Sequence, residues 1–240
     1  MGSEQESGYS LAVTREAFPV PGDDGMCGIW LTVDHSEDES LQATCCPTWL
    51  TRRGPDSTER VTVEDGTYKV DFGASVLSMR EGNVVPQPGK LEDGFHFAWN
   101  GEVYETSDAS MWSDDIADTL LVADLLKQEL HQSDLPIPNK IVRVLGHLLN
   151  TEFAFCLLCP DSIYFARDRV GCRSLEMSKT SSGFKVASVH NSDEGWNEVP
   201  PGILFEYQMA TKSLCEYPIV GPSRPPVAET RNETDASQLL

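Results

Sequence analysis

Short apolar runs separated by turn residues recur along the chain, a pattern typical of β-strands. Runs of this kind are CGIWLTV, FHFAWNGEVYE, GFKVASV and EVPPGILFEY. The segment RVTVEDGTYKVDFGASVLSM places an Asp-Gly turn between two alternating segments and therefore predicts a β-hairpin. A second hairpin is predicted for TEFAFCLLCPDSIYFARDR, whose strands are apolar enough to lie in a sheet covered on both faces.

Two segments in the middle of the chain show helical spacing instead. In SDDIADTLLVADLLKQEL the apolar residues at this spacing are Ile116, Leu120, Ala123, Leu126 and Leu130. Candidate capping residues for this helix are Ser113 and Thr119. In PNKIVRVLGHLL the corresponding residues are Ile141, Leu145 and Leu148. Strands, then two helices, then strands predict a layered α+β domain.

The two ends of the chain differ in composition from its middle. Residues 1–25 are polar and contain prolines and glycines, so they are predicted to be a flexible leader or a propeptide. Residues 219–240 are polar and contain prolines, and we expect them to be disordered. The folded domain is therefore predicted to span residues 26–218.

The charge balance excludes some classes of partner. The formal net charge is -20, from 38 acidic and 18 basic residues. Nucleic acid and anionic membranes are bound through clustered Lys and Arg, so neither is expected as a partner. The N-terminus does not resemble a signal peptide, and no run of eighteen apolar residues occurs. A cytoplasmic location is therefore expected.

Seven cysteines occur at irregular spacings that fit neither a disulfide framework nor a zinc module. Cys156 and Cys159 have CxxC spacing, but a strand would send their thiols to opposite faces, so we expect both to pack in the core. The five histidines are scattered. We therefore predict no metal site and no Cys-His pair.

Four short pieces have unusual local content, and each is weak evidence alone. They are Met26-Cys27-Gly28-Ile29, Arg52-Arg53-Gly54-Pro55-Asp56, Trp99-Asn100-Gly101-Glu102 and Arg167-Asp168-Arg169-Val170-Gly171. Taken singly, a cysteine in an apolar strand is usually part of the core, and an Asn-Gly pair is usually a turn. An Arg-Asp pair is often a surface ion pair of little energetic weight.

The order of these pieces resembles the class II glutamine amidotransferase domain of the N-terminal-nucleophile hydrolases, as found in asparagine synthetases. The resemblance spans about residues 26–218 and includes the acidic ADT that opens a helix, the block RDRVGCRSL and the later VPPG. It implies a four-layer αββα sandwich, with two mainly antiparallel sheets between helices. It also implies hydrolysis of glutamine to glutamate and ammonia, of the kind that feeds asparagine biosynthesis, without a cofactor.

The resemblance assigns roles to individual residues. The nucleophile is Cys27, and the oxyanion hole consists of the Asn100 side chain and the Gly101 backbone N–H. The α-carboxylate of glutamine is assigned to Arg80, although this chain continues Arg-Glu-Gly-Asn where asparagine synthetases continue Arg-Leu-Ser-Ile. The α-ammonium is assigned to Glu102 and Asp118. The further residues Arg53, Asp56, Arg167 and Asp168 are expected to brace the site.

The position of Cys27 inside the chain leaves three alternatives open. The free α-amine of an N-terminal cysteine can move the thiol proton, whereas an amide nitrogen has no usable lone pair. Residues 1–26 could be removed as a propeptide, or translation could begin at Met26, and either event would expose Cys27. Otherwise the chain is a catalytically inactive domain that binds or acts as a scaffold.

The amidotransferase domain of this family passes ammonia to an ATP-dependent synthetase domain, which carries a Ser-Gly-Gly-x-Asp-Ser phosphate loop. That loop does not occur in this sequence. We therefore expect the chain to be a fragment or isoform of a longer protein. The partners that the resemblance implies are glutamine and a separate or full-length synthetase domain.

Overall fold

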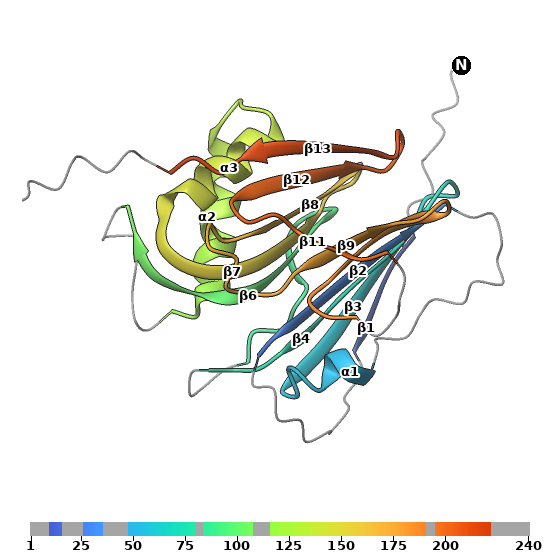
Figure 1. The fold of residues 1–240 in the computed structure, drawn as a ribbon, viewed down its shortest axis with the longest axis horizontal. Coiled ribbons are helices and arrows are strands. Elements are labelled where there is room, and N and C mark those ends of the chain that lie inside the picture. The colour runs from blue at the N-terminus through green and yellow to red at the C-terminus, as the bar shows by residue number, and fades with distance from the viewer. Residues whose placement is uncertain are drawn as a thin grey trace, which may run out of the picture.

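The computed structural model describes residues 10–15, for which only the backbone is considered, and residues 26–35, 48–79, 84–107, 116–190 and 195–221. Two antiparallel β-sheets face each other, and two helices cover the outer face of one of them (Figure 1). Figure 1 also shows that the sheets splay apart toward the end where α1 lies. The layered α+β architecture expected from the sequence is confirmed.

The first sheet has seven strands in the order β1-β3-β4-β2-β10-β9-β11. Their bounds are β1 Ser10–Arg15, β2 Gly28–Asp34, β3 Ser57–Glu64, β4 Lys69–Val76, β9 Glu176–Lys179, β10 Gly183–Ala187 and β11 Asn197–Glu198. The predicted Asp-Gly hairpin joins β3 to β4, and Gly66 has a φ of 83° that few other residues adopt.

The second sheet has six strands in the order β13-β12-β8-β7-β6-β5. Their bounds are β5 Gly89–Glu92, β6 Phe95–Thr106, β7 Leu148–Leu158, β8 Ser162–Arg167, β12 Ile203–Gln208 and β13 Ser213–Pro218. The second predicted hairpin is β7 with β8, and both of its faces are covered as expected. The segment between β8 and β9 carries the chain from the second sheet to the first.

Helices α2 (Asp118–Gln132) and α3 (Ile137–His147) pack on the second sheet. The prediction that the acidic ADT, residues 117–119, opens a helix is confirmed, whereas the prediction of Thr119 as its cap was wrong. The helix begins at Asp118 after Ala117, which provides no side-chain cap, and Thr119 lies inside the helix. The predicted capping residue Ser113 lies outside the described residues.

The predicted apolar face of α2 was also partly wrong. Leu120 is 46% exposed and Ile116 is 43% exposed, whereas Leu121 and Val122 are buried against the sheet. The segment contains more apolar residues than one helix face can bury, and α2 packs on the second sheet with Leu121 and Val122 turned inward. With Leu121 and Val122 turned inward, Leu120 in the first turn of α2 remains exposed.

The core has two large parts, one between the sheets and one between the second sheet and the helices. Cys156 lies in the first part and Cys159 in the second, so the prediction that the CxxC thiols face opposite sides and pack in the core is confirmed. On the outer face of the first sheet, Trp30, Leu50 and Ala187 form a smaller cluster. Within the described residues, the helix on this face is α1 (Thr48–Thr51).

Strand β1 comes from the segment that the sequence analysis assigned to a leader. Its backbone pairs with most of β3 at the edge of the first sheet, from Ser10 opposite Glu64 to Arg15 opposite Glu59. Each neighbouring pair in the order β1-β3-β4-β2 is antiparallel, so β1 runs opposite to β2. The last residue of β1 therefore lies at the same end of the sheet as the first residue of β2. The rest of the predicted leader, and the predicted tail beyond residue 221, lie outside the described residues.

The buried thiols of Cys156 and Cys159 predict a loss of stability at high pH. Burial raises the pKa of both, so the folded chain keeps two protons that the unfolded chain releases. The free energy of unfolding then falls by about 1.4 kcal/mol per pH unit for each thiol, once the pH exceeds the ordinary thiol pKa. We expect a double Cys156→Ala, Cys159→Ala variant to lose most of this slope in urea unfolding between about pH 8 and about pH 10.5.

The matched control for this experiment is Cys215→Ala, because Cys215 is a half-buried thiol at a separate place in the second sheet. This variant should keep the slope of the parent chain. An identical slope in the parent and the double variant would show that other groups cause the alkaline loss.

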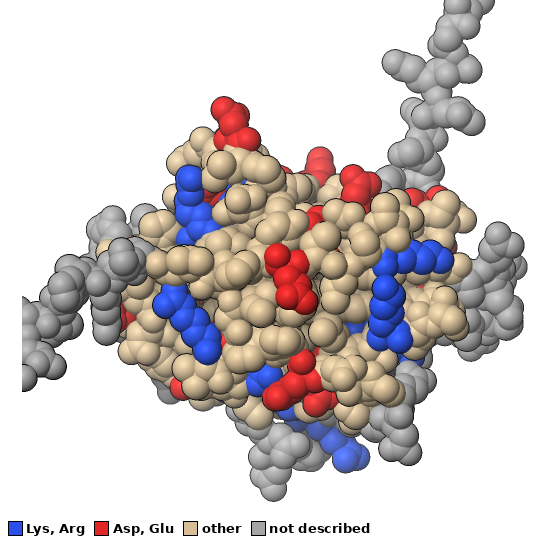
Figure 2. All heavy atoms as spheres, turned by 45° about the horizontal axis from the view of Figure 1, so that its top comes forward, with Lys and Arg blue, Asp and Glu red and all other residues tan. Residues whose placement is uncertain are grey.

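Basic side chains do not form one continuous patch on the face shown in Figure 2, where Lys and Arg lie in ones and twos among acidic and neutral residues. This arrangement agrees with the acidic balance of the sequence. In the described part of the chain, no helix is both long and apolar enough to cross a membrane.

Candidate active site

A cavity of about 120 Å³ lies where the two sheets and the start of α2 meet. Its walls come from the residue before β2, the segment after β4, the middle of β6, the first turn of α2 and the loop between β8 and β9. Five of the six predicted site residues line it, namely Cys27, Asn100, Gly101, Glu102 and Asp118. The sixth, Arg80, lies outside the described residues.

Cys27 lies immediately before β2, with its thiol in the wall of the cavity. Its Sγ accepts a hydrogen bond from the Leu77 N–H at 3.4 Å and lies 3.6 Å from the Leu77 carbonyl oxygen. Burial raises the pKa of the Cys27 thiol, and the Leu77 N–H and the Arg173 guanidinium offset part of the rise. A nearby base must therefore take the proton before this thiol can act as a nucleophile near neutral pH.

Arg53 bonds to the backbone on both sides of the peptide bond between Met26 and Cys27. Its Nε donates to the Cys27 carbonyl at 3.1 Å, and its own carbonyl accepts the Met26 N–H at 3.2 Å. Asp56 accepts the N–H of Ser78 at 2.7 Å, next to the cavity wall. Neither Arg53 nor Asp56 lines the cavity, so both brace its backbone, as expected from the sequence.

Asn100 lies inside β6 and not in a turn, although Asn-Gly is a common turn sequence. The side chain is 2% exposed and lines the cavity. Its Nδ2 is buried and meets no acceptor among the described residues. Buried polar groups nearly always have partners, so an unpaired amide beside a cavity indicates a donor kept for a ligand.

The backbone N–H of Gly101 points away from β7. Gly101 lies opposite Phe153, whose N–H and C=O both bond to Asp168 on the β8 side. The N–H and C=O of Gly101 therefore point to the other edge of β6, where the C=O accepts the Trp99 indole N–H at 3.1 Å. A Cβ on Gly101 would overlap the Glu152 carbonyl oxygen, so this position requires glycine.

Gln87 connects β6 to the start of α2. Its side-chain oxygen accepts the Trp99 N–H at 2.6 Å, and its nitrogen donates to the Thr119 hydroxyl at 3.2 Å. Gln87 is 2% exposed, and both of its partners are adjacent to predicted site residues, Asn100 and Asp118. The sequence analysis did not assign Gln87 to the site. Its buried amide fixes the distance between the oxyanion donors and the acidic end of the cavity.

Two carboxylates line the cavity, Glu102 on β6 and Asp118 at the first position of α2. Asp118 is 8% exposed. Glu102 lies directly opposite Glu152 in the register of β6 with β7. Such a group of acidic residues suits a cationic ligand such as an α-ammonium, because it attracts positive charge.

The loop between β8 and β9 is organised by Asp168, which is 2% exposed. One carboxylate oxygen accepts the N–H groups of Val170 at 2.9 Å and Gly171 at 2.7 Å. The other accepts the N–H groups of Cys172 and Phe153, each at 3.0 Å. Asp168 therefore fixes the turn and attaches it to β7.

Arg167 holds the same loop from the other side. Its Nε donates to the Arg173 carbonyl at 2.7 Å, and its Nη2 donates to the Gly171 carbonyl. Its Nη1 bonds to Glu198 at 2.9 Å and to the Val199 carbonyl at 3.2 Å. Arg167 and Asp168 do not line the cavity, so they brace the loop, as the sequence analysis expected.

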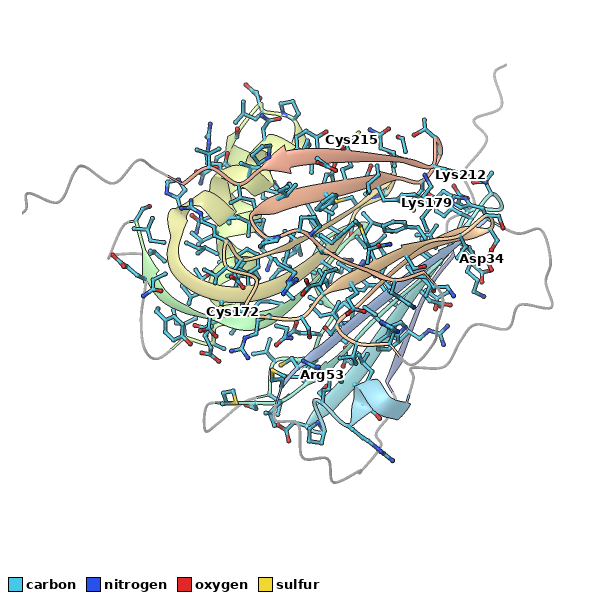
Figure 3. The ribbon with its side chains drawn as sticks, in the orientation of Figure 1. Asp34, Arg53, Cys172, Lys179, Lys212 and Cys215 are labelled. Atoms are coloured by element: carbon cyan, nitrogen blue, oxygen red, sulfur yellow. The ribbon has the colours of Figure 1, made fainter. Side chains whose placement is uncertain are left out.

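The loop brings a residue to the cavity that the sequence analysis did not assign, Arg173. Figure 3 shows the neighbouring Cys172 beside β6 and β7, whereas Arg53 lies at the end of the first sheet where β2 begins. The loop that contains Cys172 and the segment that contains Arg53 therefore lie on opposite sides of the site. Arg173 lay within the RDRVGCRSL block that the analysis had identified, but nothing in a single sequence shows which side chain of a loop points into a cavity.

The described residues contain no group of three or more His, Cys, Asp or Glu side chains that could hold a metal ion. The polar side chains in the described cavity wall supply a thiol, two amides, two hydroxyls, two carboxylates and one guanidinium, besides the Trp99 indole and backbone N–H groups.

A scan against protein-family models finds no match. Among curated proteins, the chain is 28% identical over 196 residues to asparagine synthetase domain-containing protein 1 of Bos taurus, a match that covers 79% of this chain and 29% of that protein. It is 29% identical over 198 residues to an asparagine synthetase domain-containing protein of Drosophila melanogaster, covering 79% of this chain and 33% of that protein. The chain therefore spans about a third of the length of these relatives.

Among solved structures, the chain is similar to the glutamine phosphoribosylpyrophosphate amidotransferase from B. subtilis complexed with ADP and GMP. The match has a TM-score of 0.55 and 16% sequence identity, and it covers 80% of this chain and 49% of that chain. The two share a fold. The resemblance to proteins of the asparagine synthetase kind expected from the sequence is thereby confirmed, and the fold shared with a glutamine amidotransferase confirms the α+β sandwich.

Proposed function

We propose that this domain hydrolyses the side-chain amide of glutamine, with Cys27 as the nucleophile. The observation that carries the proposal is the convergence of Cys27, Asn100, Gly101, Glu102 and Asp118 on one cavity, although they come from three separate parts of the chain. A thiol, two donors for an oxyanion and two acceptors for an ammonium are the groups that hydrolysis of an amino-acid amide needs.

The reaction takes two steps at the thiol. The Cys27 thiolate attacks the amide carbon and forms a C–S bond, and the carbonyl oxygen becomes an oxyanion between Asn100 Nδ2 and the Gly101 N–H. When this intermediate collapses, the C–N bond breaks and the nitrogen leaves as ammonia after it gains a proton. Water then attacks the thioester, the C–S bond breaks, and glutamate is released with the thiol restored.

The cavity also orients the amino-acid end of the substrate. Glu102 and Asp118 accept hydrogen bonds from the α-ammonium, because both carboxylates line the cavity together with Asn100 and Gly101. Gln87 connects the strand that carries Glu102 to the helix that carries Asp118, through its bonds to Trp99 and Thr119. By the family resemblance, Arg80 binds the α-carboxylate.

The test is the release of glutamate and ammonia in equal amounts by a chain that begins at Cys27. We expect turnover in this chain and none in the same chain with Cys27→Ala, because no other thiol lies in the described cavity wall. Both products are measured by coupled assays, and intact mass confirms the first residue. Equal rates in the two chains would assign the activity to a contaminant and contradict the proposal.

A second candidate is a domain that binds glutamine without turning it over. It is favoured by the Arg53 hydrogen bonds that hold Met26 against Cys27, and by the raised thiol pKa. Glutamine binding without product release by a chain that begins at Cys27 would support it. We infer that the ammonia acceptor is a synthetase domain of the asparagine synthetase kind, because the curated relatives are named for such a domain.

A further inference from the structure

Trp99 is the largest fully buried side chain among the described residues, and it also lines the cavity. Its ring stacks on Phe153, with the ring centroids 4.7 Å apart and the planes 20° from parallel. Phe153 is held in turn by Asp168, which accepts its backbone N–H at 3.0 Å. Stacked aromatic rings stabilise each other beyond the area that they bury. The Trp99 indole therefore has a fixed position beside the candidate site.

The indole meets β6 where that strand has lost one of its neighbours. The edge of β6 that faces away from β7 pairs with β5, and this pairing begins at Gly89 opposite Phe97. Strand β5 therefore does not reach Gly101, whose N–H and C=O both point to this edge. Gly101 is half-buried, and backbone groups withdrawn from water need hydrogen-bond partners. Beyond Phe97, these partners must come from side chains or from a ligand.

Two side chains replace β5 along this part of the edge. The Gln87 side-chain oxygen accepts the Trp99 backbone N–H at 2.6 Å, and the Trp99 indole N–H donates to the Gly101 carbonyl at 3.1 Å. The second bond fixes the peptide unit that follows Gly101 and restricts the ψ angle of a residue type with wide backbone freedom. The Gly101 carbonyl is thereby occupied, and the N–H on the same edge is left to the cavity that Gly101 lines.

We propose that Trp99 is a positioning residue, whose indole N–H holds the Gly101 carbonyl and so keeps the Gly101 N–H directed at the oxygen of the amide under attack. The use of this N–H as an oxyanion donor rests on the proposed function, whereas its fixed orientation does not. An oxyanion donor is effective when it is aimed before the negative charge develops. In this role Trp99 acts through Gly101 and not by contact with the substrate.

The first test observes the Gly101 N–H by NMR in the full 240-residue chain. Asn100-Gly101 is the only Asn-Gly pair in the sequence, so ¹³C at the asparagine carbonyl and ¹⁵N in glycine select this single amide. Trp99→Phe keeps an aromatic ring beside Phe153 but removes the donor. We expect the order parameter of the Gly101 N–H to fall from about 0.85, typical of rigid backbone, to about 0.6.

The second test measures glutamine turnover in a chain that begins at Cys27. Trp99→Phe should lower kcat by about tenfold, which is about what one hydrogen bond contributes. KM should stay within about twofold, because the donor acts on the charge of the transition state. The same loss should appear when Trp99→Phe is added to Asn100→Ala, since Trp99 acts through the other donor. A loss that disappears in this background would show that Trp99 acts through Asn100, and would overturn the assignment.

The matched control is Trp30→Phe. Trp30 is also buried, but its indole Nε1 meets no acceptor among the described residues, and Trp30 does not line the cavity. This variant loses the same atoms, so it should lower the melting temperature and leave the Gly101 order parameter and kcat at the parent values. Trp99→benzothienylalanine, in which sulfur replaces the indole N–H, keeps the size of the ring and serves if Trp99→Phe does not fold.

The outcomes separate this inference from the proposed function. An unchanged order parameter in Trp99→Phe would overturn the inference, because the indole would then only pack against its neighbours. Equal kcat values in Trp99→Phe and an active parent would also overturn it and leave the proposed function intact. A parent chain that begins at Cys27 and releases no glutamate would contradict the proposed function. The fixed orientation of the Gly101 N–H would still stand if its order parameter falls in Trp99→Phe, and would fail if it does not.

Discussion

Glutamine hydrolysis is expected to be about a hundred- to ten-thousand-fold slower in a chain that retains Met26 than in a chain that begins at Cys27. The reason lies in the nitrogen of Cys27. As an N-terminal amine with an ordinary pKa of about 8, it takes the thiol proton and later gives it to the leaving ammonia. In a peptide bond the same nitrogen has no basic lone pair.

Among the described residues, no group near Cys27 can replace this amine as a base of suitable strength. The groups that affect its thiol besides burial are the Leu77 N–H, two guanidinium groups and the Glu102 carboxylate. A carboxylate is a weak base toward a thiol whose pKa burial has raised. Met26 also narrows the site, since it lines the cavity beside Cys27 and its N–H is bonded to Arg53.

The measurement uses one preparation with a specific protease site engineered immediately before Cys27. Glutamate release is followed before and after cleavage, and intact mass gives the fraction that begins at Cys27. Because both forms come from one preparation, differences in folding yield do not affect the comparison. The control carries Cys27→Ala and should remain inactive after cleavage. Equal rates before and after cleavage would contradict the free-amine mechanism and point to a base elsewhere.

Much of the fold could be predicted because it depends on local patterns. The strands of the Asp-Gly hairpin and of β7 and β8 are apolar runs bounded by turn residues, and the structure contains both hairpins. The apolar face of α2 could not be predicted, because which of its many apolar residues turn inward depends on how the helix packs on the second sheet. Strand β1 was missed because an edge strand pairs on one side only, and its pairing with β3 leaves little signal in a polar segment.

Some residues of the candidate site could be predicted from the sequence, and others could not. Cys27, Asn100 and Asp118 were found because each lies in a short motif, and the order of the motifs resembles a known family. Arg173 and Gln87 were not found, because their roles depend on tertiary contacts. The carbonyl of Arg173 is held by Arg167, and the Gln87 side chain connects β6 to α2. A single sequence shows that such residues are present but does not show what they contact.

The second large effect is expected at Asn100. Substitution by alanine should lower kcat for glutamine by about a hundred- to a thousandfold, which is the usual effect of removing one oxyanion donor. KM should change little, because the donor bonds most strongly to the oxygen once that atom carries negative charge. The melting temperature should not fall by more than a few degrees, since Asn100 Nδ2 meets no acceptor among the described residues and its loss breaks no hydrogen bond there.

The variant Asn100→Asp sharpens this test. It keeps the shape of the side chain but replaces the donor with an acceptor, and its negative charge would repel the oxyanion. We therefore expect a loss of kcat at least as large as in Asn100→Ala. The matched control is Asn150→Ala, because Asn150 is exposed on β7 outside the cavity and should keep the parent rate.

These variants separate an oxyanion donor from a structural residue. A structural role for Asn100 would lower the melting temperature of Asn100→Ala and would affect KM and kcat together. A donor role lowers kcat alone, in the order parent, Ala, Asp. The Gly101 N–H remains in every variant, so residual turnover above that of Cys27→Ala is expected and measures what the second donor contributes. A kcat within about threefold of the parent in Asn100→Ala would place the oxyanion outside this part of the cavity.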